Sequence, residues 1–469
     1  MSVRDQFLLD SQPKERNSYD HVLSIIQTKI KNQYSDIIAN NTNEDIKKRL
    51  TTAIEKVIID DGLSVEGMST TQLADRLYED MAGSSFLNKY IYETPNVEEV
   101  NINRWDDVTV TYSGKKPEKI PEQFSTPQQA VDIVKRLLQT QNLTIDSTTP
   151  SVLSYLSDGV RICANIAPVV SKDAAVSASI RIVKTEDVTL DTIESFGTAT
   201  PEMLEFLKLC VKNYVSCCIS GSVGAGKTTT LAAMLEQARN TDRVITIEEG
   251  SREFSLLKRD ENGKVINNVL SKLTRDSDNP DLVIDQEALL EHCLRENPDI
   301  MGIGEMRSSE AYTVAEAART GTATYTTTHA SNALDTYKRL MELSYKKYPM
   351  EFSFLMMQMV DAFPIIVHQK RFPDGSRKIV EILEGVGYDS KKEKVIANML
   401  YKYVVEDNIE NEEGNIVEVK GHFEKVNNMS PSLYTRFLSN GATTTTLAKF
   451  FDSKLGEIPK IDSISGGDN

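Results

Sequence analysis

Apolar residues recur every three or four positions in the first part of the chain, which is the pattern of amphipathic helices. Two such stretches, 20–34 and 43–59, predict a helical N-terminal region over residues 1–80. The pattern then changes to short alternating runs, which predict an α+β domain over residues 81–184 with strands at 98–102, 107–112, 152–156, 160–167 and 174–183. One helix is predicted among these strands, with Thr126 as its cap, Pro127 in its first turn and its end at Gln139.

The second half of the chain alternates apolar strands with helices. Residues 185–201 are polar and contain Gly197 and Pro201, so they predict a linker with an interdomain hinge. Residues 202–462 predict an α/β domain built on a parallel sheet. Its expected strands are 214–220, 243–249, 299–304, 323–328, 364–371, 377–386, 401–405 and 416–423. The small polar tail, 463–469, is expected to be disordered.

Composition narrows the classes of function. A chain of 469 residues predicts more than one domain. The net charge of −16 argues against broad nucleic-acid binding, so no direct nucleic-acid partner is expected. Five cysteines without metal-ligand spacing favour reduced structural thiols. The first residues are polar and no long apolar run occurs, so neither a signal peptide nor a transmembrane segment is expected.

A glycine-rich loop between a predicted strand and a predicted helix carries the clearest chemistry. Residues 221–228 match G-x-x-x-x-G-K-[ST], the loop that wraps backbone N–H groups around phosphate oxygens at the start of a helix. Lys227 can reach the β- and γ-phosphates, and the Thr228 hydroxyl can hold Mg²⁺. We therefore expect ATP and Mg²⁺ as cofactors. The expected nucleotide-binding residues are Gly221, Ser222, Val223, Gly224, Ala225, Gly226, Lys227, Thr228 and Thr229.

Three expected strands after this loop end in ionisable residues. One ends in Glu248 and Glu249, the next ends at Glu305, and the third is followed by His329. Parallel strands deliver such groups near the γ-phosphate, where one carboxylate can act on Mg²⁺ and another can orient water. Glu305 is accordingly the candidate metal ligand beside Thr228, and His329 is a candidate γ-phosphate contact.

In this order the motifs resemble those of the ATPase superfamily of type II and type IV secretion systems. The matching segments are the phosphate loop, an aspartate box at 246–253, a Walker B segment at 294–307 and a histidine box at 320–330. The resemblance covers about residues 90–440 and implies a RecA-like P-loop ATPase core, preceded by an α+β domain and a helical region. Two segments near the end, 371–377 and 421–423, resemble the tight-adherence (Tad) pilus branch of the superfamily.

The resemblance also implies roles for single residues, and the catalytic candidates are Glu305, Glu248, Glu253, His329, Arg161 and Arg181. Glu305 would be the Walker B acid, and Glu248 or Glu253 would supply a second acidic role. Arg161 and Arg181 lie in segments like the family's N-terminal arginine positions and would reach the nucleotide on closure. Three departures are visible: Glu249 replaces the aspartate of the aspartate box, one residue is inserted before Glu253, and Thr322 replaces the first histidine of the histidine box.

Members of the superfamily work as hexameric rings in the cytoplasm, beneath inner-membrane platform proteins. The resemblance thus implies a cytoplasmic motor ATPase, peripheral to the membrane through its partners, that drives a Tad-like pilus or a secretion machine. Three alternatives stay open: a traffic ATPase of a conjugative type IV secretion system, a P-loop kinase, and a scaffold that binds ATP without hydrolysing it. The sequence leaves open the cargo, the direction of movement and the role of residues 1–80.

Overall fold

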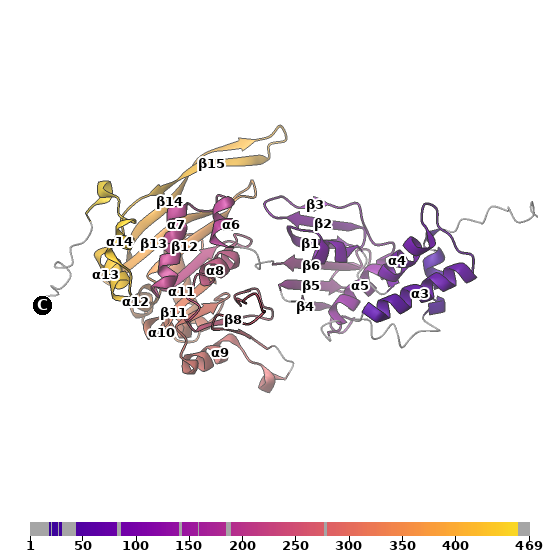
Figure 1. Ribbon diagram of the computed structural model, residues 1–469, viewed down its shortest axis with the longest axis horizontal. Coiled ribbons are helices and arrows are strands. Elements are labelled where there is room, and N and C mark those ends of the chain that lie inside the picture. The colour runs from indigo at the N-terminus through magenta and orange to yellow at the C-terminus, as the bar shows by residue number, and fades with distance from the viewer. Residues whose placement is uncertain are drawn as a thin grey trace, which may run out of the picture. The chain divides into compact units, whose positions relative to one another are not determined.

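The computed structural model describes residues 18–19, 21–26, 28–30, 44–81, 86–139, 143–157, 159–183, 189–275 and 279–457. These residues belong to two compact units (Figure 1). The first comprises residues 1–112, 117–156 and 160–182, and the second comprises 113–116, 157–159 and 183–469. The predicted disordered tail and residues 31–43, which include the end of the predicted helix at 20–34, lie outside the described residues.

Helices with a common apolar core form the beginning of the first unit. They include α3 (Glu44–Asp60) and α4 (Thr70–Met81). Leu50 and Ile54 of α3 are buried in the same cluster as Leu73 and Leu77 of α4, since apolar residues at a spacing of three or four lie on one helix face. The predicted helix at 43–59 is confirmed by α3.

A six-stranded sheet in the order β3-β2-β1-β6-β5-β4 completes the first unit. Helix α5 begins at Pro127 as predicted, and the Thr126 hydroxyl accepts the Gln129 N–H at 3.1 Å. Buried and more exposed residues alternate along β4, β5 and β6, so one face of the sheet lies in a hydrophobic core. Helix α5 contributes Ile133 and Val134 to the same core. The elements are β1 (Val97–Arg104), β2 (Asp107–Tyr112), β3 (Glu118–Lys119), α5 (Pro127–Gln139), β4 (Ser151–Ser157), β5 (Val160–Ile166) and β6 (Val176–Ile182).

The second unit is built on a nine-stranded sheet in the order β15-β14-β13-β12-β7-β11-β10-β8-β9. Strands β12, β7, β11, β10, β8 and β9 run parallel, and β13, β14 and β15 extend the sheet with antiparallel pairs. The strands are β7 (Cys217–Gly221), β8 (Val244–Glu248), β9 (Val269–Leu273), β10 (Ile300–Ile303), β11 (Ala323–Thr328), β12 (Ile365–Arg371), β13 (Arg377–Asp389), β14 (Lys394–Glu410) and β15 (Ile416–Lys425).

Two hydrophobic cores, one on each face of the large sheet, enclose its central strands. Neighbouring residues of β7 show this directly, because Cys217 belongs to one core and Cys218 to the other. The first core includes α6 (Leu190–Ser195), α7 (Pro201–Lys212), α8 (Lys227–Leu235), α13 (Pro431–Ser439) and α14 (Thr444–Ala448). The second includes α9 (Gln286–Cys293), α10 (Glu310–Arg319), α11 (Ala333–Tyr345) and α12 (Phe352–Ala362). This arrangement confirms the predicted RecA-like α/β core.

Part of the predicted linker is packed structure. Helix α6 lies inside residues 185–201, and the Thr189 hydroxyl caps it. Leu190 and Ile193 of this helix, with Ala199 after it, are buried in the core of the second unit. The predicted connector, 185–201, thus contains a short packed helix, because three buried residues among polar neighbours are enough to anchor it. The hinge itself stays a prediction.

Candidate nucleotide-binding site

The glycine-rich loop follows strand β7 and ends at the start of helix α8. Gly221, Gly224 and Gly226 have positive φ angles of 152°, 73° and 91°. A Cβ atom on Gly221 would lie 2.1 Å from the Gln369 carbonyl oxygen of β12, so only glycine fits there. The loop therefore curves tightly against the neighbouring strand and leads its backbone into the first turn of α8, as phosphate binding requires.

Lys227 is largely buried inside the curve of this loop. Its Nζ donates to the carbonyl oxygens of Gly221 at 3.2 Å and Ser222 at 3.1 Å. The same Nζ lies 3.3 Å from Nδ1 of His329, which follows strand β11. The structure thus brings together two predicted site residues that are 102 positions apart in sequence.

His329 connects the loop to Glu305. Its Nε2 lies 3.1 Å from Oε1 of Glu305, and its Nδ1 lies 2.9 Å from the Gly221 carbonyl oxygen. The Nδ1 atom can accept from Lys227 or donate to Gly221, but not both at once, so the tautomer decides between them. With the proton on Nε2, the imidazole donates to Glu305 and its Nδ1 accepts from Lys227, whereas the doubly protonated imidazolium donates to both Glu305 and the Gly221 carbonyl. Three predicted residues therefore form one contact chain at the carboxyl ends of β7, β10 and β11.

Arg307 and Glu249 extend this chain, and neither had an assigned role. Arg307 donates from Nη2 to Oε2 of Glu305 and from Nη1 to Oε2 of Glu249, both at 2.8 Å. Burial raises the pKa of the Glu305 carboxyl, but the hydrogen bond and charge of Arg307, with the charges of His329 and Lys227, hold that pKa below its usual value. Glu305 is thus an ionised carboxylate at neutral pH. Arg307 is the last residue of the Walker B segment, and this position in the sequence could have indicated that it belongs to the site.

The other predicted acids have different surroundings. Glu248 is buried, and its Oε1 accepts the backbone N–H groups of Glu253 at 2.5 Å and Phe254 at 2.9 Å. Glu253 is half-buried in the turn that these bonds hold. Among these carboxylates it is thus Glu249 that reaches Arg307, while Glu248 fixes the backbone of the turn after β8. A catalytic role for Glu248 or Glu253 stays a prediction.

Replacing Glu248 by glutamine distinguishes a structural role in the turn after β8 from a catalytic role. Burial raises the pKa of Glu248 to about 7, against the lowering effect of the two N–H donors. The pKa of this carboxyl is 4.5 in the unfolded chain and about 7 in the folded protein. Between these pH values Glu248 is ionised in the unfolded chain but protonated in the folded protein, so the free energy of unfolding falls as pH rises. The full loss is about 3 kcal/mol and is constant above pH 7. Urea unfolding of the purified variant should show this pH slope removed.

The ATP turnover of the same variant tests the predicted catalytic role. If Glu248 only fixes the turn, the variant keeps most of its turnover, because the glutamine oxygen can still accept both N–H groups. A hundredfold loss of turnover with unchanged unfolding would instead return Glu248 to the chemistry.

Arg161 and Arg181 lie side by side in the first unit. They are directly opposed across the β5–β6 pair, and Arg161 also lies over the Tyr155 ring at 5.4 Å. Like charges opposed across strands are destabilising in isolation. Both side chains are on the sheet face away from the core, and Glu99 of β1 is opposed to Arg181 on its other side, across the β1–β6 pair. That they approach a nucleotide stays a prediction.

The residues present fit a magnesium ion. Thr228 follows Lys227 in the first turn of α8, and the Glu305 carboxylate is ionised within the contact chain. Oxygen ligands of this kind are those that Mg²⁺ prefers, usually one or two from the protein with phosphate and water oxygens completing the set. In the described part of the chain, no group of three histidine, cysteine, aspartate or glutamate residues could hold a metal ion by itself.

No helix among the described residues combines the length and the apolar character needed to cross a lipid bilayer.

A phosphate loop after a central parallel strand, with an acid and a histidine at the neighbouring strand ends, defines a P-loop nucleotide-binding protein with a RecA-like core. The chain belongs to the type II/IV secretion system protein family, whose model matches residues 91–399.

Similar proteins come from archaea and bacteria. An uncharacterized protein of Methanocaldococcus jannaschii (MJ0781) is 27% identical over 48% of this chain and 31% of its own length. The conjugal transfer protein TrbB of Rhizobium radiobacter is 26% identical over 56% of this chain and 76% of its own length. Among solved structures, the Legionella pneumophila ATPase DotB is 18% identical and covers 67% of this chain and 79% of its own, with a TM-score of 0.45. The chain spans about a third of the archaeal relative.

Proposed function

We propose that this protein is a motor ATPase that hydrolyses ATP to drive a type II/IV secretion or pilus machine. The observation that carries the proposal is the contact chain from Lys227 through His329 to Glu305, with distances of 3.3 Å and 3.1 Å. Such a chain joins a phosphate-binding cation to an acid that can act on the attacking water. Membership of the type II/IV secretion system protein family supports the proposal that this reaction drives a secretion or pilus machine.

Each residue has a distinct part in this reaction. Backbone N–H groups of the glycine-rich loop and the ammonium of Lys227 bind the phosphates of ATP. Thr228 and Glu305 would hold Mg²⁺, which would supply charge neutralisation at the phosphates. Glu305 also holds or orients the attacking water, and Arg307 keeps this carboxylate ionised and in one orientation. His329 touches both the loop and Glu305, so it is placed to respond to the γ-phosphate.

Arg161 and Arg181 supply further positive charge in the proposed mechanism. The two arginines lie next to each other on one sheet face, beside Glu99, and guanidinium groups bind phosphate oxygens well. When the first unit closes on the nucleotide, they stabilise the charge that develops on the transferred phosphoryl group. Arginines in such positions contribute ~10³-fold or more to the rate of phosphoryl transfer. Closure then gives the ATPase a movement that a machine can use.

The proposed assembly is a homohexamer in the cytoplasm, bound to the inner face of the membrane through platform proteins. Among the family's branches we favour the Tad-like pilus system, because residues 371–377 and 421–423 resemble that branch. The likeness to TrbB, which covers 76% of that protein, favours a traffic ATPase of a conjugative system as the second candidate. Genome neighbourhood separates them: pilin and platform genes support the first, relaxase and coupling-protein genes the second.

The function is tested by the dependence of ATP turnover on assembly. We expect a Mg-ATP-dependent hexamer with low activity as a monomer. Arg161→Ala and Arg181→Ala should bind nucleotide normally through the phosphate loop yet lose turnover by roughly 10³-fold. Light scattering and steady-state rates on the same samples measure both properties.

Arg104→Ala is the matched control, since Arg104 lies in the same sheet but pairs with Asp106 and Asp173. This control should keep its turnover. A fully active monomer, or arginine variants with wild-type rates, would contradict the closing mechanism.

A further inference from the structure

A hairpin that the proposed mechanism does not use lies against the phosphate loop. Strand β12 ends at Arg371, strand β13 begins at Arg377, and these two arginines form the last cross-strand pair before the turn. Nε of Arg377 donates to the Gly224 carbonyl oxygen at 2.9 Å. The Cδ atom of Arg377 also lies 3.3 Å from the place of a Cβ on Gly226. The 371–377 hairpin therefore touches the loop at both of its central glycines.

The hydrogen bond from Arg377 to the Gly224 carbonyl fixes the orientation of the whole Gly224–Ala225 peptide group. A trans peptide points its carbonyl oxygen and the next N–H in opposite directions. Holding the Gly224 oxygen outward therefore turns the Ala225 N–H toward the inside of the loop, where its acceptor is the Ser222 carbonyl at 3.3 Å. Lys227 donates to the same Ser222 oxygen at 3.1 Å. The guanidinium thus sets the direction of one of the donors that phosphate oxygens would use.

The turn of the hairpin is itself held in place. Asp374 accepts the Ser376 N–H at 2.9 Å, the Ser376 hydroxyl at 2.7 Å and the Val419 N–H at 2.8 Å. These three donors and the charge of Lys378 hold the pKa of Asp374 below its usual value although partial burial raises it. Asp374 therefore ties the turn to strand β15 as an ionised carboxylate.

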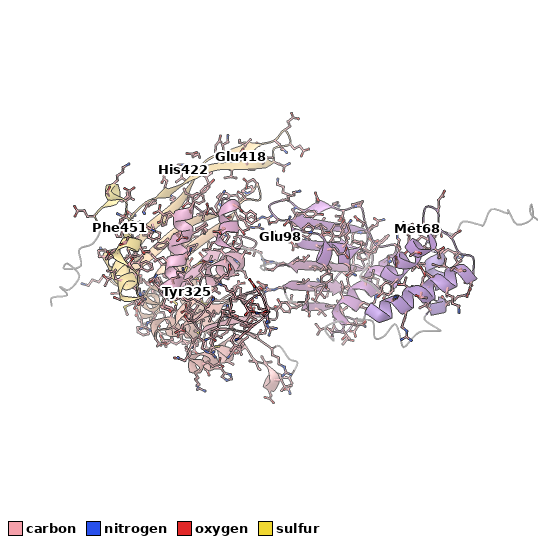
Figure 2. The ribbon with its side chains drawn as sticks, in the orientation of Figure 1. Met68, Glu98, Tyr325, Glu418, His422 and Phe451 are labelled. Atoms are coloured by element: carbon pink, nitrogen blue, oxygen red, sulfur yellow. The ribbon has the colours of Figure 1, made fainter. Side chains whose placement is uncertain are left out.

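Apolar contacts support the same connection. Phe372, Tyr403 and Val419 form a small buried cluster, with the Phe372 and Tyr403 ring centroids 5.7 Å apart. Tyr403 and Val419 belong to the β14–β15 ribbon (residues 394–425), the outer edge of the large sheet (Figure 1). Figure 2 labels Glu418 and His422 on this ribbon. The ribbon, the 371–377 hairpin and the phosphate loop are thus in continuous contact.

We propose that Arg377 is a positioning residue for nucleotide binding, which orients the phosphate loop through Gly224 and is braced by Asp374 and the β14–β15 ribbon. The inference deepens the proposed function and rests on it, because it takes the ligand of the loop to be a nucleotide. Arg377 acts through the loop backbone and not on the reacting atoms, so its loss should weaken binding more than it slows the chemical step.

The test compares Arg377→Ala, Arg377→Lys and wild-type full-length protein with Mg-ATP. Loss of a hydrogen bond from a charged donor predicts a Kd and a KM about tenfold higher in the alanine variant, with kcat changed less than about threefold. Lysine keeps the charge but not the planar donor geometry, so Arg377→Lys should restore only part of the affinity. Arg436→Ala, an exposed arginine of α13, is the control and should behave as wild type.

A second variant tests the brace. Asp374→Ala should raise KM in the same direction, and the double variant with Arg377→Ala should add little further, since both changes act on the same contact. The melting temperature of each variant shows whether the substitution in the hairpin also lowers the stability of the fold. If Arg377→Ala does not fold, Arg377→Lys carries the test on its own.

The outcomes distinguish failure of the proposed ATPase function from failure of the positioning role of Arg377. A wild-type protein that binds no nucleotide overturns the proposed function and this inference with it. Wild-type protein that binds nucleotide, with arginine variants of equal Kd and equal kcat/KM, overturns this inference alone. Arg377 variants that lose kcat at unchanged KM also overturn it, because they would give the residue a part in the chemical step.

Discussion

Replacing Lys227 by alanine should lower kcat/KM for ATP by at least about a hundredfold, which corresponds to about 3 kcal/mol of transition-state stabilisation. The ammonium is held inside the phosphate loop by the carbonyl oxygens of Gly221 and Ser222, so its charge is already where the β- and γ-phosphates would lie. Alanine removes the charge and leaves the loop with its glycines in place. Titration with a fluorescent ATP analogue, followed by steady-state rates, measures both losses.

The fold should survive this change. The side chain of Lys227 contacts the loop and His329 and belongs to neither large hydrophobic core. Lys338→Ala is a suitable control, because Lys338 is an exposed lysine of helix α11 whose nearest ionic partner is Glu342 at 3.9 Å. Turnover at the wild-type level in the Lys227 variant would show that the phosphate loop is not the site of ATP hydrolysis.

The strands around the phosphate loop could be predicted from sequence because buried parallel strands are runs of apolar and β-branched residues, and β11 is recognised by its four threonines and not by apolar residues. Strand β11 has the predicted bounds, 323–328, and β7, β8 and β10 differ by a few residues. Strand β9 could not be predicted in this way, since Val269–Leu273 is a partly exposed edge strand that contains serine and lysine. The β14–β15 ribbon is also longer than predicted, because its polar outer half, up to Glu410, pairs without a buried face.

The candidate site was predictable only where a strand ends in a chemically informative residue. Lys227, Glu305 and His329 each follow or end a buried strand, and parallel strands bring such ends together. The contacts that orient them join segments far apart in sequence. Arg307 and Glu249 are separated by 58 positions, and Arg377 and Gly224 by 153. No local pattern specifies such pairs, and only the folded sheet does.

Replacing Glu305 by glutamine should leave ATP bound but slow its hydrolysis by roughly 10²–10⁴-fold, the usual contribution of a catalytic acid or base. The carboxylate lies one contact away from the loop, through His329 at 3.1 Å, so phosphate binding by the loop itself does not depend on its charge. Glutamine has nearly the same shape, and its oxygen can still accept from Arg307. What it loses is the negative charge that acts on Mg²⁺ or on the attacking water.

The pH dependence of the wild-type enzyme gives a second check on Glu305. Since Arg307, His329 and Lys227 hold the pKa of this carboxyl below its usual value of 4.5, Glu305 stays ionised throughout the neutral range. Ionisation of Glu305 should therefore impose no loss of turnover between pH 6 and pH 8. Equilibrium binding and single-turnover rates at saturating ATP separate affinity from chemistry in the glutamine variant. An affinity that collapses while the single-turnover rate is unchanged would make Glu305 a binding residue, and the acid that acts on water would then have to be Glu248 or Glu253.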